Sequence, residues 1–159
     1  MQLAPRIAVV GERDASRTIA AEAEQVGREI AMRGGILICG GMGGVMEAAA
    51  RGCQAAGGIT VGIIPTADPD DANDYVTIPI VTGMGEGRNI VVVRSAQAVI
   101  AIGGSYGTLS EIALALRLNI PVIGLHTWVF SKEQSDEHDP VVRVSNAKEA
   151  VDQAWSAIG

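Results

Sequence analysis

The sequence predicts an α/β fold: a Rossmann-like, doubly wound sheet that is mainly parallel and carries helices on both faces. Three observations predict it. Short, continuously apolar runs alternate along the chain with longer segments in which apolar residues recur at helical spacing. The runs have no polar side, which is typical of parallel strands covered on both faces. Aromatic residues make up only 3% of the chain, so Val, Ile, Leu, Ala and Gly must fill a core of helices packed closely on a sheet.

The position of each strand and helix is predicted from the residues of that segment. Strands are predicted at residues 6–10, 36–39, 59–64, 75–81, 98–102 and 121–125, which are rich in Ile, Val and Ala. Helices are predicted at residues 16–33, 45–56, 109–118 and 146–158, and a short one opens in the 83–88 loop and runs through residue 93. Glycine pairs at 34–35 and 57–58 end the first two helices. The stretch between residue 125 and the last helix is predicted to be a polar tail.

The length and charge of the chain limit its organisation and its partners. A chain of 159 residues without repeats or a linker is predicted to be a single nucleotide- or cofactor-binding domain, residues 1–159. The formal net charge is −6, so we expect no nucleic acid and no membrane surface among its partners. An anionic ligand must then be held by local donors. No apolar run approaches the roughly 20 residues of a membrane span, and the N-terminus does not have the pattern of a signal peptide.

The cysteines and histidines predict neither a disulfide nor a metal site. Cys39 and Cys53 form no CxxC pair and no disulfide framework, which favours a reducing, cytoplasmic location. His126 and His138 lie in different segments and lack metal-ligand spacing, so no protein-bound metal is predicted.

Three glycine-rich turns are expected at one edge of the sheet. They are GGMGG at 40–44, GMGEG at 83–87 and GGSYGT at 103–108, and each follows a predicted strand. In a doubly wound sheet, ligands bind beyond the carboxyl ends of the strands, where helix N-termini offer free N–H groups and a partial positive charge. Glycine lets a ligand oxygen approach the backbone without meeting a Cβ. The turns therefore predict a site for a small phosphorylated ligand, and the alternative is that they only make tight strand-to-helix turns.

Other phosphate and nucleophile motifs are missing. The chain has no G-x-x-x-x-G-K-[ST] sequence, and the turn after the first strand, VVGERD, lacks the dinucleotide fingerprint, which disfavours hydride chemistry. There is no G-x-S-x-G nucleophile elbow either. Ser105 and Ser110 are instead predicted to be turn and helix N-terminal residues.

The stretches CGGMGGVMEAAARGCQAAGGITVGIIP, GRN and GGSYGTLSE together resemble the Rossmann-like superfamily once mislabelled lysine decarboxylases. The resemblance covers roughly residues 6–125. The best-known enzymes of this superfamily are the lonely-guy phosphoribohydrolases, which release cytokinin bases from nucleoside 5′-monophosphates. It also contains molybdenum-cofactor carrier proteins, which bind the pterin phosphate cofactor without turning it over. With the glycine turns, the resemblance implies ligand-binding residues at Gly41, Gly43, Gly44, Arg88, Gly104, Ser105, Tyr106, Gly107, Thr108 and Glu111.

The phosphoribohydrolase motifs R-K-x-x-M and P-G-G-x-G-T-x-x-E are matched only in part. The matching residues are Arg88, Gly104, Gly107, Thr108 and Glu111. The departures are Asn89 for the lysine, Val92 for the methionine, Gly103 for the proline and Ser105 for the second glycine. The chain is more similar to the carrier branch, whose members typically read GRN before the helix and GG-x-x-GT-L-SE-IALAL after the strand.

Arg88 and Glu111 are catalytic residues only if the protein is an enzyme. Cleavage of an N-glycosidic bond builds positive charge on the ribose, which Glu111 could stabilise while Arg88 holds the phosphate or orients that carboxylate. The alternative is a first-turn helix carboxylate that forms an ion pair with Arg88. Asn89 offers only neutral hydrogen bonds where the enzymes have a cation, which disfavours catalysis.

The function expected from these features is a carrier that binds and protects the molybdenum cofactor (molybdopterin) and delivers it to molybdoenzymes. One alternative is a nucleoside 5′-monophosphate phosphoribohydrolase that binds an AMP-like nucleotide, and a second is a nucleotide sensor that acts through a partner. Because the 109–118 helix is apolar on more of its surface than one sheet face needs, and because the enzyme relatives are dimers with shared sites, we expect a homodimer or homotetramer.

Two features of the sequence, Cys39 and the polar tail, each allow two interpretations. Cys39 is either core filler or a soft ligand for molybdenum. The tail with Trp128 and Phe130 covers either a subunit interface or the mouth of the pocket. Replacing Gly104 or Gly107 by valine is expected to block the ligand and leave the fold largely intact.

Overall fold

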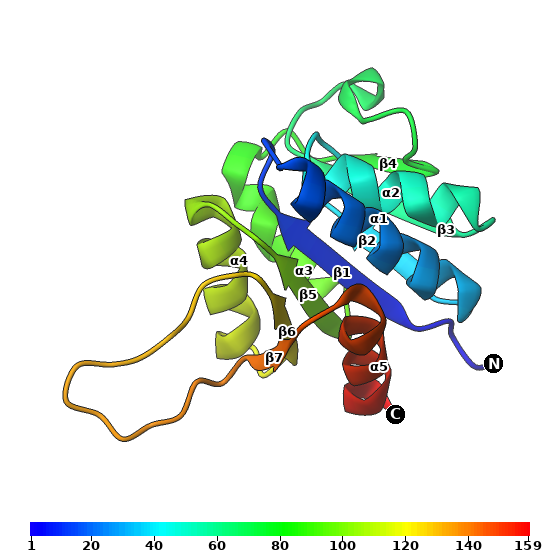
Figure 1. The fold of residues 1–159 in the computed structure, drawn as a ribbon. Coiled ribbons are helices and arrows are strands. Elements are labelled where there is room, and N and C mark those ends of the chain that lie inside the picture. Colours follow the sequence, from blue (N-terminus) through cyan, green and yellow to red (C-terminus); the bar gives the residue numbers. More distant parts are fainter.

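The computed structural model describes residues 1–159 and confirms the predicted fold class (Figure 1). Seven parallel strands form one sheet in the order β4-β3-β2-β1-β5-β6-β7. The strands are β1 (Arg6–Gly11), β2 (Ile36–Cys39), β3 (Ile59–Ile64), β4 (Ile78–Val81), β5 (Ala98–Ile102), β6 (Val122–Leu125) and β7 (Val142–Val144). The helices are α1 (Arg17–Met32), α2 (Val45–Ala55), α3 (Asn89–Arg94), α4 (Tyr106–Arg117) and α5 (Ala147–Ile158), with short 3₁₀ turns at Pro69–Asp71 and Gly85–Arg88.

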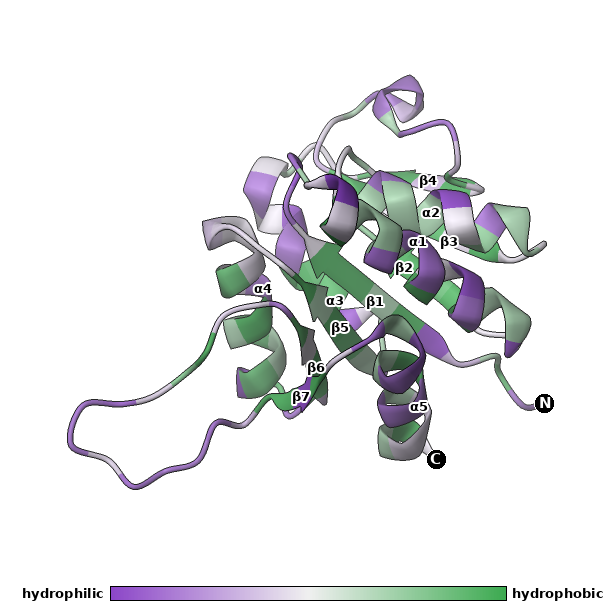
Figure 2. Cartoon of the chain, viewed as in Figure 1, coloured by the Kyte–Doolittle hydropathy of each residue, from purple (hydrophilic) through white to green (hydrophobic).

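Helices cover both faces of the sheet, and successive strand residues alternate between the two. In β1, Ile7 and Val9 pack with α1, α2 and α5 in one core cluster, while Ala8 and Val10 pack with α3 and α4 in the other. Figure 2 shows the resulting pattern, with hydrophobic strands inside and hydrophilic residues on the outer sides of the helices. None of the helices combines the length and the hydropathy that crossing a lipid bilayer requires.

The helices differ in how their N-termini are capped. The Ser16 hydroxyl accepts the Ile19 N–H at 3.2 Å at the start of α1, and the Asn146 side chain accepts the Glu149 N–H at 2.9 Å at the start of α5. The starts of α2 and α4 have no such side-chain cap. The first N–H groups of a helix have no partner inside it. At α2 the Val45 N–H donates to the Glu12 carbonyl at 2.9 Å, whereas the start of α4 has no side-chain cap.

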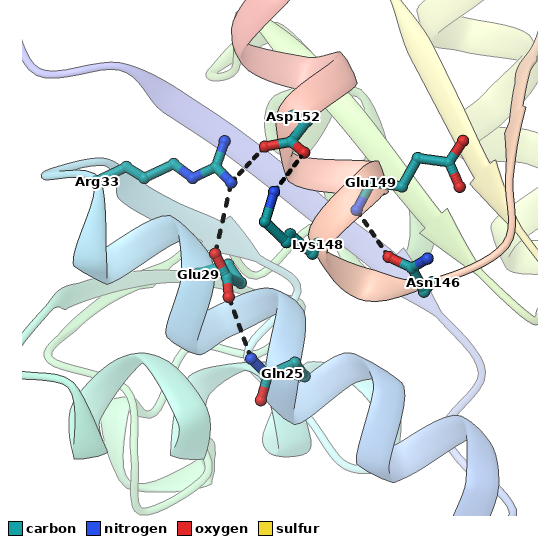
Figure 3. A network of polar contacts seen from close by, with 7 residues as sticks. All are labelled: Gln25, Glu29, Arg33, Asn146, Lys148, Glu149 and Asp152. Carbon is teal, nitrogen blue, oxygen red and sulfur yellow. Dashed lines mark hydrogen bonds and ion pairs between the residues drawn. The ribbon is translucent and has the colours of Figure 1, made fainter.

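A network of charged side chains joins α1 to α5 (Figure 3). Arg33 Nη2 lies 2.5 Å from Asp152 Oδ1 and 3.5 Å from Glu29 Oε2, and Lys148 Nζ lies 2.9 Å from Asp152 Oδ2. The Arg33 guanidinium also lies 5.7 Å from the ring centre of Trp155. Exposed pairs of this kind add little stability each, so the network mainly fixes how α5 lies against α1.

The structure differs from the predicted elements in three places. β7 lies in the stretch predicted to be a polar tail, because pairing with β6 in the register Ile123↔Val142 holds a strand too short to show a pattern of its own. β4 spans only residues 78–81 of the predicted 75–81. α4 starts at Tyr106 rather than at residue 109, so the last glycine of the 103–108 turn lies inside its first turn.

Candidate functional site

A cavity of about 700 Å³ opens at the carboxyl edge of the sheet, beyond the ends of β1 and β5. These two strands are neighbours, and the chain leaves them in opposite directions across the sheet, with β2 beside β1 and β6 beside β5. Such a switch point is where doubly wound sheets bind ligands, and the volume is that of a site for a small molecule. The predicted residues that line the cavity are Arg88, Ser105, Tyr106, Gly107, Thr108 and Glu111.

Of the glycines in the 40–44 turn, the predicted ligand-binding residues Gly41, Gly43 and Gly44 do not line the cavity. A Cβ on Gly44 would lie 2.1 Å from the carbonyl oxygen of Glu12, and one on Gly41 would lie 2.5 Å from Ile64 Cγ2. Gly43 has only an ordinary contact with the loop after β1. Gly41 and Gly44 therefore let the turn pass close to its neighbours, while Gly40, at the start of the same turn, lines the cavity.

Gly104 contacts other residues of the protein, so its N–H is not free for a ligand. Its φ is +131°, and a Cβ there would lie 2.7 Å from Thr108 Cγ2. Its N–H donates to Glu12 Oε2 at 3.1 Å. The expectation that Gly104→Val leaves the fold largely intact is therefore wrong, because valine would strain the backbone and collide with Thr108.

The N-terminus of α4 forms one wall of the cavity and is open to a ligand. Ser105 occupies the capping position but makes no side-chain capping bond. Gly107 lines the cavity, and a Cβ on it would meet nothing within 4 Å. The Thr108 hydroxyl is buried, with the residue 2% exposed, and has no hydrogen-bond partner. Free N–H groups, a helix dipole and an unpaired hydroxyl together favour an anion at this point.

Arg88 supplies a buried cation to the same cavity. The residue is 6% exposed; its Nη1 donates to Asn89 Oδ1 and its Nη2 donates to the Gly40 carbonyl at 3.4 Å, while Nε has no partner. Burial lowers the pKa of Arg88, and the nearby Glu111 carboxylate opposes that shift. Arg88 and Glu111 form no direct ion pair. The alternative interpretation, in which Glu111 forms an ion pair with Arg88, is therefore wrong. Asn89, a departure from the enzyme motif, instead orients the guanidinium.

Glu111 lines the same cavity, and its carboxyl group has a shifted pKa. Burial raises its pKa to about 7, and the positive charge of Arg88 partly counteracts the rise. Near neutral pH the group therefore exchanges between a carboxylate and a neutral acid. A neutral Glu111 removes a negative charge from the cavity.

The Glu111→Gln variant is expected to be more stable than the parent at about pH 8, by on the order of 1 kcal/mol after allowance for partial solvent exposure, and equally stable near pH 4. The folded carboxyl, with a pKa of about 7, holds its proton more tightly than an ordinary one at 4.5. The parent therefore loses stability as the pH rises through this window, and glutamine does not. Thermal unfolding across the pH range, with the exposed Glu133→Gln as control, checks this. Parallel curves for parent and Glu111→Gln would contradict it.

Sequence reasoning missed the loop after β1. Glu12, Arg13 and Asp14 line the cavity, as do Glu86 and Met46. Arg13 is a second cation, close enough that its charge lowers the pKa of Arg88. The signal was present in the sequence: the first strand of such a sheet is central, so the loop that follows it lies at the switch point whether or not it carries a glycine fingerprint.

Cys39 belongs to the core. The residue is fully buried at the end of β2, and burial raises the pKa of its thiol to about 12. Since a thiolate is the form that binds metals, this neutral, enclosed thiol is core filler rather than a soft ligand. Trp128, at the start of the long loop after β6, does not itself line the cavity, but its indole N–H donates at 3.0 Å to the carbonyl of Ser105, which does.

Comparisons with known proteins agree with this geometry. The structure resembles that of the molybdenum cofactor binding protein from the phototrophic bacterium Rippkaea orientalis, with a TM-score of 0.90 and 37% identity over 100% of both chains. It also resembles the molybdenum cofactor carrier protein from Chlamydomonas reinhardtii, with a TM-score of 0.84 and 32% identity over 97% of this chain and 98% of the other. An uncharacterised protein of Archaeoglobus fulgidus is 46% identical over 112 residues, which are 70% of this chain and 74% of that protein.

These likenesses confirm the resemblance to the superfamily and its carrier branch that the motifs indicated. The model of the SLOG cluster4 family matches residues 4–151, which include every strand and the whole wall of the cavity. The chain therefore belongs to the SLOG cluster4 family.

Proposed function

We propose that the protein is a molybdenum-cofactor carrier, which holds the phosphorylated pterin as cargo and protects it without chemical change. The observation that carries the proposal is that the uncapped N-terminus of α4 and the buried Arg88 line the same switch-point cavity. The likeness to a molybdenum cofactor binding protein along the whole chain supports this choice of ligand.

The residues of the cavity fit a terminal phosphate. The N–H groups of Gly107 and Thr108 begin α4, the Thr108 hydroxyl is buried without a partner, and Arg88 Nε is unpaired. Each neutral hydrogen bond contributes on the order of 1 kcal/mol, and those made by the guanidinium contribute more. We call these donors the phosphate cradle. The loops after β1 and β5 leave room beyond it for the rest of a pterin-sized ligand.

A nucleoside 5′-monophosphate phosphoribohydrolase is the second candidate. Arg88 and Glu111, the pair that the resemblance assigns to such enzymes, both line the cavity. Against it, Asn89 accepts a hydrogen bond from Arg88 at the position where the enzymes carry a lysine. A nucleotide sensor that acts through a partner uses the same cradle and differs only in needing that partner.

Two assays on the same preparations test the proposal. A carrier keeps the molybdenum cofactor active under air, as measured by transfer to an apo-molybdoenzyme, and releases no adenine from AMP above background. Glu111→Gln is expected to retain the cofactor as well as the parent or better, because one negative charge near the phosphate is removed. An enzyme shows the opposite: the parent releases adenine steadily, and Glu111→Gln loses most of that rate with little loss of binding.

The proposal includes a homodimer or homotetramer, located in the cytoplasm, that passes its cargo to molybdoenzymes. The apolar surface that supports self-association lies on the edge strand rather than on α4, where Leu114 and Leu116 pack against the core. All four residues of β4 are exposed, with Ile78 at 48% and Ile80 at 44%, and Ile59 of β3 is 43% exposed. A bare apolar edge strand invites pairing with another chain, and a second copy would cover it.

Light scattering at micromolar concentration is expected to give a multiple of the chain mass of 16.4 kDa. Replacing Ile78 and Ile80 by glutamate is expected to shift the protein toward the monomer, because charges on the edge oppose pairing. A matched pair of glutamates at Val129 and Ser131, in the exposed loop, is the control. A monomeric parent would end this part of the proposal.

A further inference from the structure

An aromatic side chain that lines the cavity, Tyr106, contacts a second one, Trp128, in a chain that has few. The chain contains two Trp, two Tyr and one Phe. Tyr106 lines the cavity and is 80% exposed, and among exposed large apolar side chains only the terminal Met1 is more exposed. The ring centre of Tyr106 lies 5.7 Å from that of Trp128, with the ring planes inclined by 31°. Most of the Tyr106 ring is thus free beside the cavity.

The pair is fixed to the start of α4. The Trp128 indole N–H donates to the Ser105 carbonyl at 3.0 Å, and the Trp128 side chain packs against the core cluster under α3 and α4. This bond ties the base of the long loop, which extends away from the body of the protein in Figure 1, to the residue before the helix. Trp128 therefore supports Tyr106 from one side and leaves the rest of its ring open to the cavity.

Tyr106 lies directly beside the phosphate cradle in the chain. Tyr106 is the first residue of α4, and Gly107 and Thr108 follow it directly. A ligand with a short bridge between its phosphate and a flat ring can therefore reach the cradle and the Tyr106 ring at once. Flat nitrogen heterocycles stack on aromatic side chains whatever their substituents, because each has a π face.

We propose that Tyr106, supported by Trp128, is a stacking platform for the planar nitrogen heterocycle of the ligand. The inference rests on the proposed function, since it assumes a phosphate at the start of α4. Tyr106 selects for ligands that carry such a ring on a short phosphorylated bridge, and discriminates against sugar phosphates and inorganic phosphate, which the cradle alone would also accept.

Calorimetric titration with matched probes tests this inference. Neopterin monophosphate carries a pterin on a short phosphorylated carbon chain, glycerol phosphate has a similar chain without the ring, and AMP carries a purine. We expect Tyr106→Leu to weaken neopterin monophosphate by about tenfold and to leave glycerol phosphate unchanged. Tyr106→Phe keeps the ring and is expected to bind as the parent does. In a Trp155→Phe background, where Trp128 is the only tryptophan, AMP is expected to change its emission and glycerol phosphate is not.

Each outcome separates the inference from the function on which it rests. Equal affinity of the parent and Tyr106→Leu for both neopterin monophosphate and AMP would overturn the platform and leave the cradle standing. A parent that binds none of the three probes would overturn the cradle, and with it the proposed function. A loss confined to AMP would support the platform with a purine as its ring.

Discussion

Arg88→Ala is expected to weaken the binding of a phosphorylated ligand by about a hundredfold, the largest effect of any single side-chain truncation in the cavity. Arg88 is the buried cation of the site, and a charge-assisted hydrogen bond to phosphate in such a place contributes more than a neutral one. Its Nε has no partner in the protein, so one donor is free for the ligand. Isothermal titration with AMP or neopterin monophosphate measures the change.

The controls for Arg88 separate loss of the cation from loss of structure. Truncation leaves the Gly40 carbonyl and Asn89 Oδ1 without their donor, so Arg88→Gln, which keeps a donor but no charge, is measured beside it. Arg94→Ala removes an exposed cation from the end of α3 and is expected to bind normally. If Arg88→Ala melts at the temperature of the parent and still binds the ligand equally well, the cation does not serve the phosphate.

Gly107→Val is expected to abolish binding of the same ligands while the fold is kept. A Cβ on Gly107 meets no protein atom within 4 Å, and its φ is not in the left-handed region, so the side chain fits the helix and extends into open space. The residue lines the cavity, and that space is where a phosphate would approach the helix N-terminus. Gly107→Ala, with a smaller side chain, is expected to bind more weakly than the parent and to unfold at the same or a higher temperature, since alanine favours a helix by about 1 kcal/mol over glycine.

A valine at an exposed position of the same helix, outside the cavity, is the control for Gly107. Ala113 is exposed on α4 and does not line the cavity, so Ala113→Val adds the same side chain without touching the ligand. Normal binding by Ala113→Val together with none by Gly107→Val is the expected pair of results. Normal binding by both would show that the phosphate does not lie at the start of α4.

Most of the fold can be predicted from the sequence because its strands are buried on both faces. Runs such as residues 98–102 are apolar throughout and are separated by glycine turns, so the positions of six strands along the chain follow from pattern alone. β7 cannot be predicted in this way, since its three residues form a strand only through pairing with β6. The first turn of α4 cannot be predicted from the sequence for a related reason. Gly107 is a poor helix former, and it is helical because it continues the helix formed by the residues after it.

The site can be predicted in part, and the limits are physical. Arg88, Thr108 and Glu111 meet in the cavity as their motifs imply. The motif cannot show which glycines face a ligand: Gly107 opens into the cavity, whereas Gly44 allows the 40–44 turn to pass the loop after β1. Nor can it show that Asn89 holds Arg88, because that contact depends on the turn between the 3₁₀ segment and α3.

The molybdenum and pterin content of the protein, purified from cells that make the cofactor, tests the central claim most directly. The account predicts that the parent carries molybdenum and a phosphorylated pterin in equal amounts, and that Arg88→Ala and Gly107→Val, folded and equally abundant, carry almost none. A parent that binds neither molybdenum nor pterin and steadily releases adenine from AMP, with that release lost in Glu111→Gln, would contradict it.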